Sequence, residues 1–147
     1  MQQELVRIGF AAQAPTTLGM LYHYSFTTNH YSNASIRVTA HVSIFGTSTN
    51  EITAVEADVS SEDSSTLKEY AQQFLGYISM LRYDGSDVNV RLWVEMNVKK
   101  PTATNSVSGV DVILTTPSPH TKMIRMIKKI EPATPPYSEP AARSPQR

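Results

Sequence analysis

The segment SIRVTAHVSIF, residues 35–45, decides the fold class, because its apolar and polar residues alternate. One face carries only apolar side chains: Ile36, Val38, Ala40, Val42 and Ile44. A period of two is typical of an antiparallel strand with one buried face and one wet face. The preceding segment GMLYHYSF, residues 19–26, alternates in the same way, so the two predict a β-hairpin joined by residues 27–34.

A register follows if paired residue numbers sum to 64, because every apolar side chain then meets an apolar partner. In this register His23 faces His41, with Cβ atoms about 5 Å apart. Two such imidazoles could share a metal ion, or repel each other when both are protonated. No third ligand lies nearby in the sequence, so ordinary surface polar residues are the favoured interpretation of this pair.

Four more segments are expected to be strands, which makes about six in all: residues 5–10, 51–59, 88–98 and 109–116. The clearest is VNVRLWVEMNV, residues 88–98, where valine, leucine and methionine occupy every second position. Arg91 and Trp93 then lie on its wet face, where Trp93 could form a subunit contact or stack on a nucleic-acid base.

One long helix is predicted over residues 62–82. Ser61 is its expected cap, acidic residues follow at the N-terminal end, and Arg82 lies at the C-terminal end. Its apolar residues recur at helical spacing, which favours a helix packed along one face of the sheet.

A second, shorter and basic helix is predicted over residues 119–130. Ser118 can cap it, Pro119 suits its first position, and Pro132 would end it. A strand paired with residues 109–116 through the PSPH turn is the alternative. The proline-rich segment 131–147 is expected to be a flexible arm.

The predicted fold is therefore α+β: one domain over residues 1–130, with a mainly antiparallel sheet and two helices, followed by the arm. The chain of 147 residues contains no cysteine and no apolar run long enough to span a bilayer. Its N-terminus lacks the pattern of a secretory signal. A cytoplasmic protein is expected, in a host cell or a virion if the source is viral.

Charge divides the chain into two halves. Residues 1–98 contain ten acids and five bases, a net charge of −5, and residues 99–147 contain eight bases and three acids, a net charge of +5. Such a chain could bind a polyanion at one end, or pair with a copy of itself. Six residues form the predicted polyanion-binding set: Lys99, Lys100, Lys122, Arg125, Lys128 and Lys129.

Catalytic and cofactor motifs are missing from the sequence, which contains no phosphate-binding loop, nucleophile elbow or zinc-protease motif. We therefore expect no enzyme, no cofactor and no metal. The favoured function is a self-associating structural protein, a homo-oligomer of the kind found in virus or phage particles, touching nucleoprotein or a membrane surface. The alternative is a module that binds single-stranded RNA or DNA. The arm, with Lys129, Pro132 and Pro135 spaced as in an SH3 ligand, could bind a protein partner.

Overall fold

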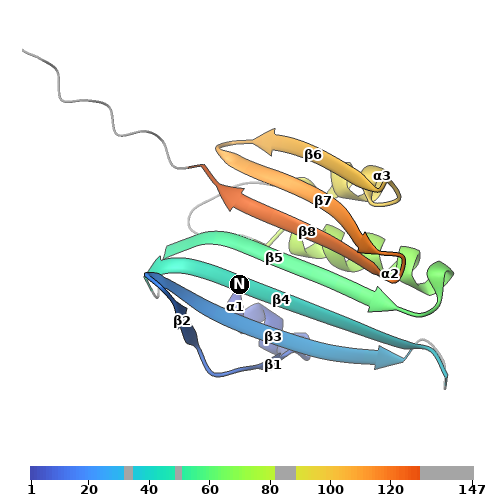
Figure 1. The fold of residues 1–147 in the computed structure, drawn as a ribbon, viewed down its shortest axis with the longest axis horizontal. Helices are drawn as coiled ribbons and strands as arrows, with labels where there is room; N and C mark the ends of the chain where they lie inside the picture. The colour runs from blue at the N-terminus through green and yellow to red at the C-terminus, as the bar shows by residue number, and fades with distance from the viewer. Residues whose placement is uncertain (32–34, 49–50, 82–88, 130–147) are drawn as a thin grey trace, which may run out of the picture.

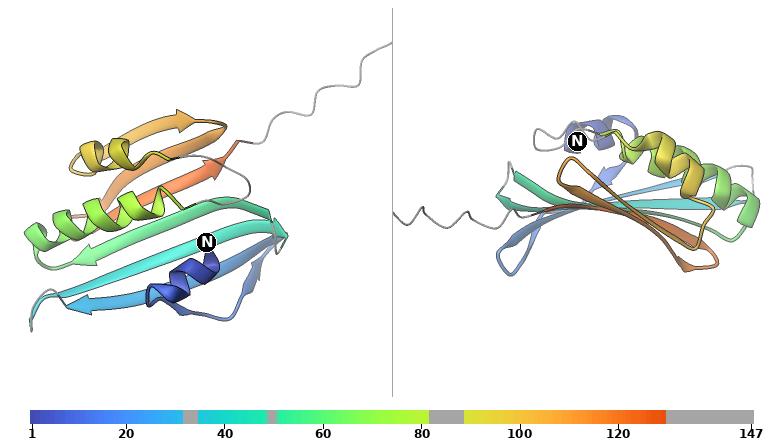
Figure 2. Two further views of the ribbon diagram at one scale, coloured as in Figure 1. Left: turned by 180° about the vertical axis from the view of Figure 1, so that it is seen from behind. Right: turned by 90° about the horizontal axis from the view of Figure 1, so that it is seen from above.

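The computed structural model describes residues 1–31, 35–48, 51–81 and 89–129. Over these residues it confirms an α+β fold, with one eight-stranded antiparallel sheet and three helices. All three helices lie on the same face of the twisted sheet (Figure 1, Figure 2). In chain order the elements are α1 (Gln2–Arg7), β1 (Ala11–Ala12), β2 (Thr16–Leu18), β3 (Leu21–Tyr31), β4 (Arg37–Ser48), β5 (Glu51–Ser61), α2 (Ser64–Ile78), α3 (Arg91–Asn97), β6 (Thr102–Val107), β7 (Val110–Ser118) and β8 (Thr121–Lys128).

The strands follow the order β1-β3-β4-β5-β8-β7-β6 across the sheet, and β2 also pairs with β3. The core lies between the sheet and the helices. Alternate side chains of β4, β5, β7 and β8 point into it, and so do the apolar residues of α2 and α3. Its largest fully buried members include Leu5, Ile44, Leu75, Ile124 and Met126.

The β3–β4 hairpin is present, but its predicted register is wrong. Paired residue numbers sum to 68, so that His23 faces Phe45 and His41 faces Thr27. Both sums place even-numbered residues opposite even-numbered residues, and the same side chains face the core in either case. The alternation therefore identified the buried face but could not fix the position of one strand along the other.

The long helix is present and begins later than predicted. Asp63, rather than Ser61, caps α2 by accepting a hydrogen bond from the Thr66 backbone N–H at 2.7 Å. The helix ends at Ile78, and Ser79 then donates its hydroxyl to the Gly76 carbonyl. Residue 82, the predicted end, lies outside the described residues.

The strand predicted over residues 88–98 is wrong where the structure describes it, because residues 91–97 form α3; residue 88 lies outside the described residues. Val90, Val94 and Val98 are buried, and a spacing of four places them on one side of a helix. This side packs on the core, while α3 lies against α2 at Gly76, where a Cβ would be 3.6 Å from the side chains of Arg91 and Glu95.

The basic helix predicted over residues 119–130 is also wrong, and its alternative is confirmed: β8 pairs with β7 in a hairpin. Lys122, Ile124 and Met126 point toward the helices. The alternation looked poor in the sequence because this buried set includes a lysine, and because Ile127 points to the other face. Residue 130 and the predicted arm, residues 131–147, lie outside the described residues.

The first predicted strand, residues 5–10, is wrong as well, since residues 2–7 form α1. The hydroxyl of Tyr77 donates to Glu4 at 2.6 Å, which joins α1 to α2. The hydrogen bond from Arg7, and after it this bond from Tyr77, lower the pKa of Glu4 to about 2. The sheet exceeds the expected six strands because β1, β2 and β6 are short or polar and gave no apolar alternation.

Candidate interaction surfaces

No described element covers the second face of the sheet, which we call the open face. Hydroxyl side chains are frequent on it, and Ser60 of β5 bonds Thr121 of β8 at 3.0 Å. His23 stacks on Phe45 with ring centroids 4.8 Å apart, and bonds Ser43 at 3.2 Å. His23 and His41 do not form the pair considered from the sequence, and no three potential metal ligands cluster among the described residues.

Charges on the open face are paired across strands. Arg125 of β8 binds Glu56 of β5 at 2.5 Å, and His41 of β4 lies 3.2 Å from Asp58 of β5. Because β5 pairs with β8, the acidic and basic segments meet inside one chain. The charge asymmetry along the sequence therefore does not become a positive and a negative side of this face.

The six predicted polyanion-binding residues divide between two ends of the molecule. Lys99 and Lys100 are exposed after the C-terminal end of α3. At 3.3 Å per residue, Arg125 in the middle of β8 lies about 10 Å from Lys122 along the strand, and Lys129, just past its end, about 23 Å. Lys129 is bound to Asp111 at 3.2 Å.

Lys122 lies on the helix-covered face of the sheet and is only 9% exposed. Its ammonium group donates to the Thr116 hydroxyl at 2.7 Å and to the Lys100 carbonyl at 3.3 Å. Burial, and to a lesser degree the charge of Lys68, lower the pKa of Lys122. This ammonium group is used inside the fold and is not presented to a polyanion.

The predicted contact residues Arg91 and Trp93 both lie on α3. Arg91 binds Glu95 one turn further along at 2.6 Å, and Trp93 is half-buried against the core. The same helix exposes two residues that the sequence reasoning missed, Leu92 at 71% and Met96 at 70%. They lie half a turn away from the buried valines, a relation that only helical spacing reveals.

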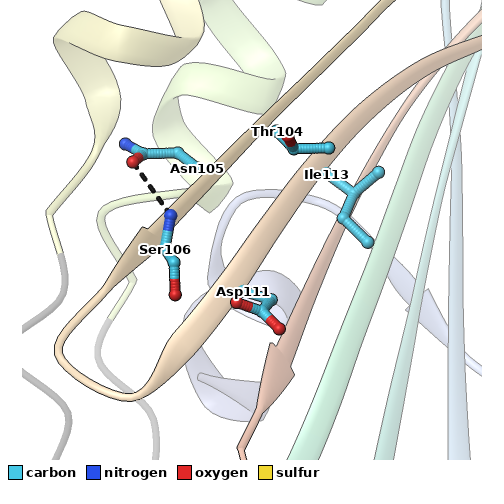
Figure 3. Close-up of a pocket in the computed structure, with 5 residues that line it drawn as sticks. All are labelled: Thr104, Asn105, Ser106, Asp111 and Ile113. Atoms are coloured by element: carbon cyan, nitrogen blue, oxygen red, sulfur yellow. Dashed lines mark hydrogen bonds between the residues drawn. The ribbon is translucent and has the colours of Figure 1, made fainter.

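One edge of the sheet is β6, and no described strand pairs with its outer side. Ser108 and Gly109, both with positive φ, form the two-residue turn to β7, which makes Val107–Val110 the closing hydrogen-bonded pair. Hydrogen-bonded and non-hydrogen-bonded pairs alternate along the hairpin from that pair. The backbone N–H and C=O groups of Thr104 and Ser106 therefore point away from β7. The Ser106 N–H donates to the side-chain oxygen of Asn105 at 2.9 Å (Figure 3).

A shallow hollow of about 510 Å³ lies over the β6–β7 hairpin. Its lining consists of Thr104, Asn105, Ser106, Asp111 and Ile113 (Figure 3). Hydrogen bonds from Ser106 and from Lys129 lower the pKa of Asp111, so its carboxylate is ionised at neutral pH.

The opposite edge is formed by β1 and β2, which pair with β3 in two short pieces separated by a segment that includes Pro15. The tip of the β2–β3 hairpin carries a second group of exposed apolar residues. Leu18 is 55% exposed and Met20 94%, with Leu21 and Tyr22 beside them.

A comparison with known protein families, curated proteins and solved structures finds no match to this chain. In the part of the chain that the structure describes, no helix is both long and apolar enough to cross a membrane.

Proposed function

We propose that the protein is a non-catalytic structural protein that associates with further copies of itself, as a subunit of an assembly such as a virus or phage particle. The exposed apolar side of α3 carries this proposal. Leu92 and Met96 lie one turn apart with more than two thirds of their surface in water. Adjacent large apolar side chains of this kind are typical of surfaces that bind other proteins.

Two further features support self-association. The second apolar group, around Met20, lies at the opposite edge of the sheet, and two separate contact surfaces would let a subunit bind more than one neighbour. The setting of a particle rests on the general character of the sequence, which lacks cysteine and catalytic motifs and includes a proline-rich arm. The opposite net charges of residues 1–98 and 99–147 do not support the proposal, because acidic β5 and basic β8 pair with each other within one chain.

The test compares the molar mass of the full chain with that of a Leu92→Ser, Met96→Ser double variant, by size exclusion with light scattering. We expect the mass of the parent to rise with concentration and that of the double variant to stay near the monomer. Val6→Ser is the matched control, because Val6 is also an exposed apolar residue, 53% accessible, but lies on α1. Equal masses for parent and double variant at every concentration would show that α3 is not part of the interface.

A second candidate function is binding of single-stranded nucleic acid. Lys99 and Lys100 favour it, since both are exposed just after the helix that carries Trp93. Two phosphate contacts predict that log K falls with log salt at a slope near −1.4, about 0.7 for each contact. A Lys99→Glu, Lys100→Glu variant should lose this dependence in a fluorescence titration with an oligonucleotide. An anionic membrane surface would use the same two lysines, and vesicle co-sedimentation tests it.

A further inference from the structure

We propose that the outer edge of β6 is where two copies join, each β6 pairing antiparallel with β6 of the second copy about a two-fold axis at Thr104. The two sheets would then form one continuous sheet. This inference rests on the proposed function and specifies its first contact.

The two edges of the sheet differ in a way that supports this choice. β1 and β2 cover the outer side of β3 in short, interrupted pieces, a common way to prevent an edge from pairing with another chain. Among the described residues no strand pairs with the outer side of β6, and none of the residues 102–107 is charged or a proline. An uncharged edge strand of this kind readily accepts another strand.

The backbone of β6 fixes how the two copies would pair. Directly opposed residues must lie on the same face of the sheet, so their numbers sum to an even value. A sum of 208 places Thr104 opposite Thr104 of the second copy, and Thr102 opposite Ser106. Those are the residues whose N–H and C=O groups point away from β7, and the register uses all of residues 102–106.

Asn105 opposes this pairing. Its side-chain oxygen accepts from the Ser106 N–H, which the new ladder would need for Thr102 of the second copy (Figure 3). The carboxamide must release this N–H before the outer pairs can form. A symmetric dimer pays this free-energy cost twice, because each copy contains one hydrogen bond between Ser106 and Asn105.

The helix layer supports the same contact. α3 lies on the helix-covered face at the β6 side of the sheet, so pairing two β6 strands places both copies of α3 on the same side of the joined sheet (Figure 2). A strand edge about 20 Å long with one short helix buries about 1,000 Å² in total, at the low end for a specific interface. The dimer should therefore be weak, with Kd in the micromolar range.

Two variants of the full chain test the edge in opposite directions. Thr104→Pro removes an N–H that points outward, so the β6–β7 ladder should stay intact while the new ladder loses its centre. We expect Kd from sedimentation velocity to rise at least tenfold. Asn105→Ala frees the Ser106 N–H in both copies, and Kd should fall about fivefold to thirtyfold, as expected for one or two released hydrogen bonds.

Circular dichroism and thermal unfolding check that each variant is folded, and Thr104→Lys replaces the proline variant if that one unfolds. Amide exchange of the parent gives an independent reading, since the Thr104 N–H should become protected as concentration rises. If the parent associates but neither Kd nor Thr104 exchange responds, the β6 contact is wrong and self-association stands. If the parent is monomeric up to about 1 mM, both the β6 contact and self-association are wrong, because micromolar affinity would then be absent.

Discussion

The contact between α2 and α3 allows a specific prediction for a substitution at Gly76. This glycine lies in the last turn of α2, and a Cβ built there would meet side-chain atoms of Arg91 and Glu95 at 3.6 Å, an ordinary van der Waals distance. Gly76→Ala should therefore fit without displacing α3. It should also remove the conformational cost of a glycine in a helix.

The size of the effect follows from two contributions. Helix propensity favours alanine over glycine by about 0.5–1 kcal/mol near a helix end, and the added methyl group is buried, worth at most about 0.8 kcal/mol. We expect stabilisation by about 1–1.5 kcal/mol, which raises Tm by about 3–5 °C for a chain of this size.

Urea and thermal unfolding of the parent and Gly76→Ala measure this change. Gly76→Leu is the opposing variant, because its longer side chain must enter space occupied by the stems of Arg91 and Glu95, and it should lower Tm. A lower Tm for Gly76→Ala would refute the described packing of α3 on α2. It would show that the helices approach more closely at Gly76 than 3.6 Å allows.

Three further predictions concern charge and register. Glu4→Gln should lower Tm at pH 7 but not near pH 2: the carboxylate pKa is lowered, so its stabilisation exists above the unfolded pKa and is lost as pH falls through about 2. Lys122→Met should raise Tm at pH 7, and the gain should shrink toward pH 10.5, because a lowered lysine pKa makes folding more favourable as pH rises. In oxidised double-cysteine variants, the 23/45 pair replacing His23 and Phe45 should cross-link, while the pair replacing His23 and His41 should not. Unchanged Tm differences across pH, or cross-linking of the second pair, would contradict these assignments.

Much of the sheet could be predicted because the buried face of an antiparallel strand imposes a period of two. The strands predicted over residues 19–26, 35–45, 51–59 and 109–116 fall largely within β3, β4, β5 and β7, which leave out residues 19–20, 35–36 and 109. The same rule misled over residues 88–98, where the apolar residues at every second position include valines at every fourth, Val90, Val94 and Val98. Packing against Gly76 of α2 selects the helix there, and that contact is not visible in a local pattern.

The interaction surfaces were harder to predict for a related reason. β6 shows no clear apolar alternation, because Asn105 lies between Ala103 and Val107 on its inner face, and its importance depends on its place at the edge, which only the strand order reveals. Lys122 looked like a surface cation because its acceptors, the Thr116 hydroxyl and the Lys100 carbonyl, come from other segments. Arg91 and Trp93 were placed on a strand face, and their role in a subunit contact remains a prediction.

Small-angle X-ray scattering of the full chain over a range of concentrations tests the central claim most directly, because it reports mass and shape together. Pairing through β6 predicts that the mass rises toward a dimer and that the particle lengthens across the strands, since the sheets join edge to edge. A constant monomer mass would contradict self-association. A dimer that stays compact would show that the copies meet through a face of the molecule and not through β6.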